Sequence, residues 1–145
     1  MRPWSEALSL ACRLFLAALY LWAAHDKVWQ PAEFAGAMAV YDILPLWSVN
    51  AASVALAWLE LMIGLLLVSG VWVRAAAAWA GGLLALFTLL MLWAGFTGAG
   101  FDCGCLPGGG SHPAGFEAAL RDFLMLLPAL WLLWRPGRWL ALRPL

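Results

Sequence analysis

Charged residues are scarce in this sequence. Asp, Glu, Lys and Arg make up 11% of its 145 residues, and the formal net charge at pH 7 is +0. Without a basic excess, the chain has no electrostatic footprint for nucleic acid, which we therefore exclude as a partner. Hydrophobic residues account for 66% of the chain, far more than in soluble globular domains. The composition excludes an ordinary soluble domain and indicates a protein that folds in lipid.

Four apolar stretches reach the length of about 20 residues that a helix needs to cross a bilayer. They cover residues 5–24, 49–71, 75–96 and 118–134. None of them alternates with the period of two that barrel strands show, and backbone groups in lipid are satisfied within a helix. Arg13 interrupts the first stretch, which argues against a cleaved signal peptide. We therefore expect an all-α fold, an integral membrane four-helix bundle in a single domain.

Basic residues are unevenly distributed between the two ends of these stretches. Arg2, Arg74, Arg135, Arg138 and Arg143 lie on one side, and Lys27 and Arg121 lie on the other. The side with more arginine is expected to be cytoplasmic. This predicts cytoplasmic termini, a short cytoplasmic turn at Val73 and Arg74, and outer loops at residues 26–48 and 97–115.

The first outer loop contains a helical pattern of its own. Pro31 suits the first position of a helix, where its missing N–H is not needed. Phe34, Met38 and Tyr41 then recur at helical spacing before Pro45. We therefore expect a short helix that lies at the membrane interface.

Cysteine is also scarce, with three residues in the chain. Cys103, Gly104 and Cys105 form a pair in the second outer loop, on the side of the membrane where disulfides persist. A bridge between residues two apart strains the backbone, and glycine supplies the unusual dihedral angles that the turn needs. A strained bond is easily reduced. The pair therefore predicts a redox-active disulfide, Cys103–Cys105.

Two other interpretations of this pair stay open. The bridge could be an inert structural link, although so short a loop removes little chain entropy. Thiolate and imidazole also suit copper or zinc, which makes Cys103, Cys105 and His112, or His25, an alternative soft-metal site. Cys12 lies in the cytoplasmic half of the first stretch and is expected to be a small buried core residue.

Polar residues gather at the outer ends of the first and fourth stretches. With the acidic neighbour of the cysteine pair, they are a candidate supporting site, and they are His25, Asp26, Lys27, Asp102, Arg121 and Asp122. The alternative is ordinary anchoring of the helix ends at the interface.

Two charged residues fall inside the apolar stretches. Counted at about 1.5 Å per residue, Arg13 and Glu60 both come to lie about 12 Å from the cytoplasmic edge of the hydrocarbon core. This predicts an ion pair, Arg13–Glu60, between the first two membrane helices. Charged groups at this depth are also candidates for function, here proton uptake or a contact with a quinone.

Short motifs are spread over nearly the whole chain, namely Arg13, Lys27, Phe34, Tyr41, Leu44-Pro45, Glu60, Gly64, Gly70, Asp102-Cys103-Gly104-Cys105 and Arg121-Asp122. In these residues the sequence resembles the DoxX-like membrane proteins, and within them the redox-associated branch named for methylamine utilisation protein MauE. The resemblance implies a four-helix bundle in a bacterial inner membrane that works beside periplasmic thioredoxin-like proteins. In that family the role is tied to maturation of a disulfide-rich dehydrogenase subunit.

Together these observations predict a membrane thiol-disulfide oxidoreductase or redox relay that acts on periplasmic thiol partners or a disulfide-bearing client. Quinone-linked disulfide oxidases are the mechanistic analogy, so a membrane quinone is the expected electron acceptor. Those oxidases carry a second cysteine pair that this chain lacks, so either a partner supplies it or the single pair exchanges directly. The alternatives are a soft-metal binding membrane protein and a noncatalytic assembly subunit of a larger membrane complex.

Overall fold

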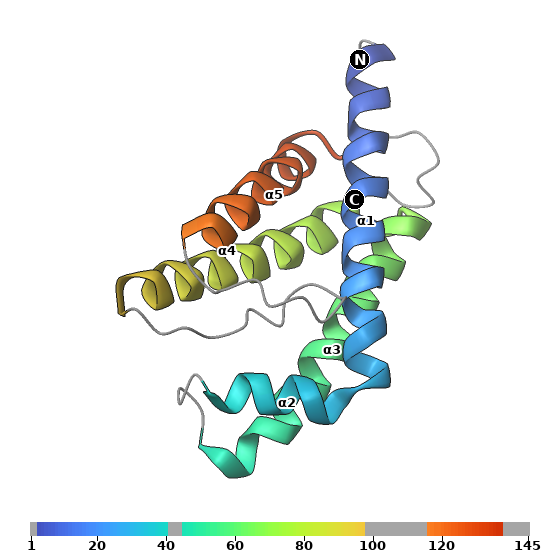
Figure 1. The fold of residues 1–145 in the computed structure, drawn as a ribbon. Helices are drawn as coiled ribbons and strands as arrows, with labels where there is room; N and C mark the ends of the chain where they lie inside the picture. The colour runs from blue at the N-terminus through green and yellow to red at the C-terminus, as the bar shows by residue number, and fades with distance from the viewer. Residues whose placement is uncertain (1–2, 41–44, 98–115, 138–145) are drawn as a thin grey trace.

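The computed structural model describes residues 3–40, 45–97 and 116–137. These residues form α1 (Pro3–Trp29), α2 (Pro31–Val40), α3 (Leu46–Ser69), α4 (Val73–Thr97) and α5 (Phe116–Trp134), as Figure 1 shows. No strand occurs in the described residues, and the prediction of an all-α fold is confirmed.

The first helix is longer than its apolar stretch. It does not stop near residue 24 but continues to Trp29, so that Lys27 lies in its last turn. The backbone N–H of Gln30 still donates to the carbonyl of Asp26 at 2.8 Å, and Pro31 then begins α2 at once. The short helix expected after Pro31 is therefore present, and its position at the membrane interface stays a prediction.

A tight turn of Gly70, Val71 and Trp72 joins α3 to α4. Gly70 has φ of 68° and ψ of 22°, the left-handed conformation that glycine adopts without strain, and its N–H donates to the Leu66 carbonyl. Val73 begins α4, so the cytoplasmic turn predicted at Val73 and Arg74 is wrong by a few residues. The cause is that the glycine cap ends α3 before the apolar run ends.

Within residues 3–40, 45–97 and 116–137, three helices are long and apolar enough to span a membrane, over Trp4–Trp29, Trp47–Ser69 and Val73–Trp93. Large apolar side chains such as Trp58 and Leu89 are exposed along them, as contact with lipid requires. The chain is therefore a multi-pass membrane protein. The fourth span stays a prediction, because α5 carries three charged residues in its first two turns, Glu117, Arg121 and Asp122.

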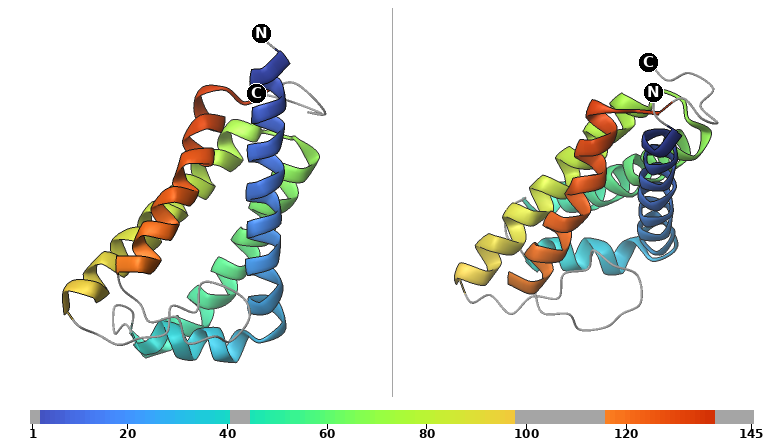
Figure 2. Two further views of the ribbon diagram at one scale, coloured as in Figure 1. Left: turned by 45° about the horizontal axis from the view of Figure 1, so that its top comes forward. Right: turned by 90° about the horizontal axis from the view of Figure 1, so that it is seen from above.

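The long helices pack as two pairs. α1 lies beside α3, and α4 lies beside α5, and the pairs diverge from the end where α3 turns into α4 (Figure 2). Close approach within each pair depends on small residues. A Cβ atom on Gly64 of α3 would come within 2.7 Å of the Leu21 side chain of α1, and one on Gly81 of α4 would touch Ala129 of α5 at 3.6 Å.

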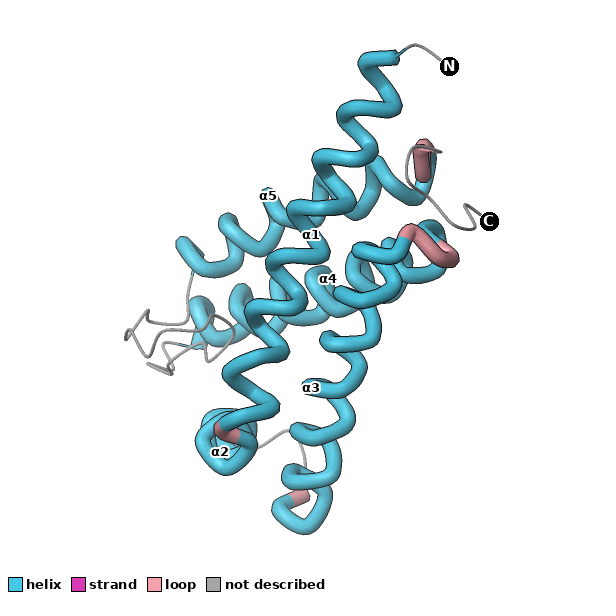
Figure 3. The backbone as a smooth tube through the Cα atoms, turned by 90° about the vertical axis from the view of Figure 1, so that its right-hand side faces the viewer, coloured by secondary structure: helices cyan, strands magenta, loops and turns pink. Residues whose placement is uncertain are grey.

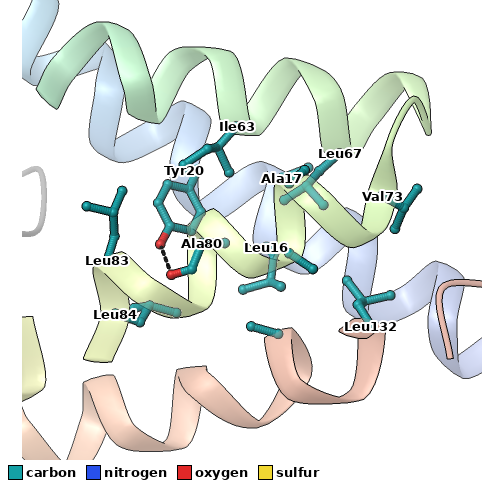
Figure 4. Close-up of a cluster of buried hydrophobic side chains, with 13 residues drawn as sticks. Leu16, Ala17, Tyr20, Ile63, Leu67, Val73, Ala80, Leu83, Leu84 and Leu132 are labelled. Atoms are coloured by element: carbon teal, nitrogen blue, oxygen red, sulfur yellow. Dashed lines mark hydrogen bonds between the residues drawn. The ribbon is translucent and has the colours of Figure 1, made fainter. Parts of the chain in front are cut away.

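A buried apolar cluster joins the two pairs where they converge (Figure 4). Leu16 of α1, Val73 of α4 and Leu132 of α5 are each 0% exposed. The Tyr20 hydroxyl of α1 donates to the carbonyl of Ala80 in α4 at 2.7 Å and ties the pairs together across this cluster.

The described ends of the chain lie at this same end of the molecule. The Ser9 hydroxyl of α1 donates to the carbonyl of Arg135, just past α5, at 2.8 Å, and the Trp131 indole N–H donates to Ser9 Oγ at 3.1 Å. Arg74 Nε at the start of α4 donates to the Leu133 carbonyl at 3.2 Å. Figure 3 shows the loop just past α5 and the turn between α3 and α4 as pink segments near the C label, at this same end of the molecule. Which side of the membrane this end faces stays a prediction.

Candidate functional site

A buried ion pair connects α1 and α3. Lys27 Nζ lies 2.6 Å from Glu60 Oε1, and the two side chains are 6% and 3% exposed. A charge-assisted hydrogen bond of this length is strong, and burial in an apolar bundle makes the pairing obligatory because either charge alone would be costly there. Lys27 reaches Glu60 because α1 continues past its apolar stretch.

Two aromatic rings complete the surroundings of the Lys27 ammonium. The centroid of Phe34 in α2 lies 4.8 Å from Nζ, and that of Phe87 in α4 lies 5.7 Å away. Both distances are in the range of cation–π attraction. One ammonium group therefore contacts α2, α3 and α4 from its position on α1.

A second ion pair belongs to α5. Arg121 Nη2 and Nε lie 3.2 Å and 3.3 Å from Asp122 Oδ1. The Asp122 side chain is buried, while that of Arg121 is partly exposed. Both residues face the same pocket as the Lys27–Glu60 pair.

We call this space the polar pocket. It is lined by the four charged residues and by Tyr20, with apolar walls from α1, α4 and α5, and the full set is Leu19, Tyr20, Ala23, Lys27, Glu60, Leu84, Phe87, Arg121, Asp122 and Met125. Its free volume is about 40 Å³. One ordered water takes about 10 to 15 Å³ on this measure, so the polar pocket has room for about three waters.

One atom of the polar pocket lacks a protein partner. Glu60 Oε2 is buried, and no hydrogen-bond donor reaches it from the residues that the structure describes. The carboxylate is therefore satisfied by Lys27 on one oxygen only, which is unusual for a buried polar group.

The structure corrects the predicted ion pair of Arg13 and Glu60. Glu60 is level with the last turn of α1, since α3 extends beyond the end of α1 and Gly64 lies against Leu21. Arg13 lies about 21 Å from Lys27 along the axis of α1, at about 1.5 Å per residue. The depth estimate failed because it assumed that both helices begin and end level with the membrane edges.

The six predicted supporting residues separate into three groups. Lys27, Arg121 and Asp122 meet at the polar pocket. His25 Nδ1 lies 3.1 Å from Asp26 Oδ1 and its ring packs against Trp29, but both side chains are largely exposed and neither lines the pocket. Asp102 lies outside the described residues.

The cysteine pair, Cys103 and Cys105, and His112 also lie outside the described residues, so the predicted disulfide and the alternative metal site stay predictions. Within the described ranges, no group of three potential metal ligands occurs. Cys12 carries a free thiol, is partly buried and packs against the apolar cluster, as expected for a core residue.

Tyr20 and Phe87 belong to the polar pocket and were not predicted from the sequence. Tyr20, Ala23 and Lys27 are spaced three and four residues apart and so lie on one face of α1, a signal that could have linked Tyr20 to Lys27. For Phe87 no such signal exists, because one phenylalanine among many apolar residues of α4 is not distinguished by its neighbours.

Comparison with known proteins gives one family. The family model of methylamine utilisation protein MauE matches residues 5–135. No match was found among curated proteins or among solved structures. The matched range contains the whole polar pocket as well as Cys103 and Cys105.

Proposed function

Because the chain belongs to the family of methylamine utilisation protein MauE, we propose that it is a membrane thiol-disulfide oxidoreductase or redox relay. Its reacting groups are Cys103 and Cys105, and its partners are thioredoxin-like proteins or a disulfide-bearing client on the outer side of a bacterial inner membrane. The observation that carries the proposal is the Cys-Gly-Cys pair, in a chain that otherwise has a single cysteine. The proposal takes the segment that contains the pair to be an outer loop, where a disulfide persists and can exchange.

The helices that flank the cysteine segment support this proposal. Residues 98–115 connect α4 to α5, and the rings of Phe96 and Phe116 on either side of that segment meet edge to face at 5.3 Å. Arg121 follows Phe116 by about 8 Å along α5, at about 1.5 Å per residue. The ends of α4 and α5 that flank the segment are therefore close to each other, at the end of the molecule away from the described ends of the chain.

The exchange proceeds in two steps. A thiolate of the reduced partner attacks one sulfur of the Cys103–Cys105 disulfide, which forms a mixed disulfide and releases the other sulfur as a thiolate. A second thiolate of the partner attacks the mixed disulfide, so that the partner leaves as a disulfide and both cysteines are reduced. Two electrons pass to the pair, and two protons from water complete the thiols. A second partner with a disulfide re-oxidises the pair by the reverse steps.

The polar pocket is too small for the ring of a quinone. The polar pocket holds about three waters, whereas a substituted quinone ring is larger. A relay between two disulfide-bearing partners needs no quinone.

The test is the reduction potential of the pair in nanodiscs. The protein is equilibrated with glutathione buffers of known potential, and the thiols are alkylated and counted by mass. We expect Cys103 and Cys105 to be reduced together, with a midpoint well above about −300 mV, the range of exchangeable bonds. Cys12→Ser provides the matched control, because it removes the free thiol inside the bundle and is expected to leave the midpoint unchanged.

Three results would contradict the proposal. A midpoint below that range would make the bridge structural and favour the assembly subunit. A pair that never oxidises but binds copper or zinc stoichiometrically would favour the soft-metal site with His112. Mixed disulfides between a Cys103→Ser variant and a thioredoxin-like partner that form through Cys12 would show that Cys103 and Cys105 are not the reacting groups.

A further inference from the structure

Glu60 is the side chain in the polar pocket whose hydrogen bonding is incomplete. Its carboxylate is 2% exposed, Oε1 accepts from Lys27, and Oε2 has no donor among residues 3–40, 45–97 and 116–137. A buried carboxylate oxygen without a donor is unfavourable. A water bound beside Oε2 can donate to it. A proton taken up on Oε2 removes the buried negative charge, and the new hydroxyl group can then donate to that water.

The surroundings of Lys27 allow Glu60 to lose its charge. The ammonium lies against the rings of Phe34 and Phe87, which attract a cation whether or not Glu60 is ionised. A buried lysine with no other stabilising group would force Glu60 to stay charged. Here the two rings stabilise the ammonium group of Lys27 while the carboxyl group of Glu60 gains or loses a proton.

Every helix that packs against Glu60 can be checked for charge. α1 contributes Lys27 and the hydroxyl of Tyr20, and α5 contributes Arg121 and Asp122. α4 contributes Phe87 and Leu84 but no charged side chain to the pocket, and Phe34 is the group of α2 that faces Lys27. The pocket thus contains two positive and two negative groups, and one added proton leaves a single net positive charge.

The polar pocket borders both carboxylates, those of Glu60 and Asp122. The pocket has room for about three waters, and Tyr20 lines it together with Glu60 and Asp122. Several polar partners around a space of this size are what a buried water requires.

We propose that the polar pocket is an internal water- and proton-binding site in which Glu60 Oε2 is the atom that accepts the proton. A hydronium ion transfers one proton to Oε2, the carboxylate becomes a neutral carboxyl group, and a water molecule is left in the pocket. Lys27 keeps its proton and its contacts with the two rings. Asp122, paired with Arg121, stays ionised and stabilises the protonated site. The inference rests on the described residues alone and not on the proposed thiol exchange.

Infrared difference spectroscopy of the full chain in nanodiscs tests this site. Lowering the pH is expected to produce the carbonyl stretching band of a buried protonated carboxylic acid, and D₂O is expected to shift the band to lower frequency because the site exchanges with water. Labelling the glutamates with ¹³C is expected to shift the same band, which separates glutamate from aspartate. Glu60→Gln is expected to remove the band completely.

Matched controls come from the other glutamates. Glu6 is the other buried glutamate and Glu117 is an exposed one at the start of α5. The band is expected to persist in Glu6→Gln, Glu33→Gln and Glu117→Gln. With the isotope label these three variants assign the band to Glu60 by elimination, even if Glu60→Gln fails to fold.

Two results would overturn the inference. One is the lack of any label-sensitive band at all acidic pH values at which the protein stays folded. The other is loss of the band in Glu6→Gln. A variant with both Cys103→Ser and Cys105→Ser is expected to keep the band, so failure of the redox proposal and failure of this one give different spectra.

Discussion

The two helix pairs meet in two regions of opposite chemistry. Near the α3–α4 turn they are joined by Leu16, Val73 and Leu132, which are all 0% exposed. Toward the other end the pairs face each other across the polar pocket, which Lys27–Glu60 lines from one pair and Arg121–Asp122 from the other. Tyr20 lies between the regions and donates to Ala80 from the margin of the pocket.

The two regions are expected to differ in how strongly their stability depends on pH. Apolar packing keeps the same energy at any pH and in any redox state. The interaction energy of an ion pair in a low dielectric changes strongly when one of its groups gains or loses a proton. We therefore expect the stability of the apolar cluster to be independent of pH, and that of the polar pocket to depend on it.

The largest effect is expected from Lys27→Met. The change leaves the Glu60 carboxylate buried without its cation and should reduce the free energy of unfolding by about 3 kcal/mol at neutral pH. The loss should shrink at acidic pH, because a protonated Glu60 no longer needs a partner. The measurement is denaturant unfolding in mixed micelles at both pH values.

The double variant Lys27→Met/Glu60→Leu is the control for that comparison. It removes both charges, so it should recover most of the lost stability and lose the dependence on pH. If the double variant is no more stable than Lys27→Met, the loss of stability in Lys27→Met does not come from the unpaired charge of Glu60.

A smaller effect is expected from Leu132→Ala in the apolar cluster. The cavity should cost about 2 kcal/mol, less than in a water-soluble core because lipid gives no hydrophobic transfer term. The cost should be the same at neutral and acidic pH. Leu130→Ala in the same helix, where the side chain is 42% exposed, should cost much less. A pH-dependent loss in Leu132→Ala would break the distinction between the two regions.

The smallest effect is expected from Tyr20→Phe. The variant keeps the ring and removes the hydrogen bond to the Ala80 carbonyl, at a cost of about 1 kcal/mol. Its pH dependence sharpens the comparison, because a change with pH would assign Tyr20 to the polar pocket and a constant cost would assign it to the apolar cluster. Unfolding at two pH values gives both quantities.

The positions of the helices were largely predictable from the sequence, and their pairing was not. Apolar runs at 49–71 and 75–96 correspond to α3 and α4 within a few residues. A helix in lipid is apolar on its outer face as well as its inner face, so the sequence carries little information on which helices face each other. That α1 pairs with α3 and α4 with α5 had to come from the structure.

The ion-pair partner of Glu60 could not be predicted from the sequence for a related reason. The apolar run of α1 fades before His25, and the helix was expected to end there. Lys27 was therefore placed outside the bundle, and Arg13 was left as the cation to pair with Glu60. The convergence of Phe34 and Phe87 on Lys27 depends on how three helices are oriented, which no local pattern encodes.

The connection at Gly70 has a consequence for how the protein is made. α3 and α4 follow each other directly through Gly70, Val71 and Trp72, yet each finds its main partner elsewhere in the chain. During synthesis α3 can dock on the completed α1 as soon as it enters the membrane, whereas α4 has to wait for α5, which follows it in the chain. We therefore expect biogenesis in two stages, in which a chain interrupted before residue 116 exposes to lipid the face of α4 on which Gly81 lies.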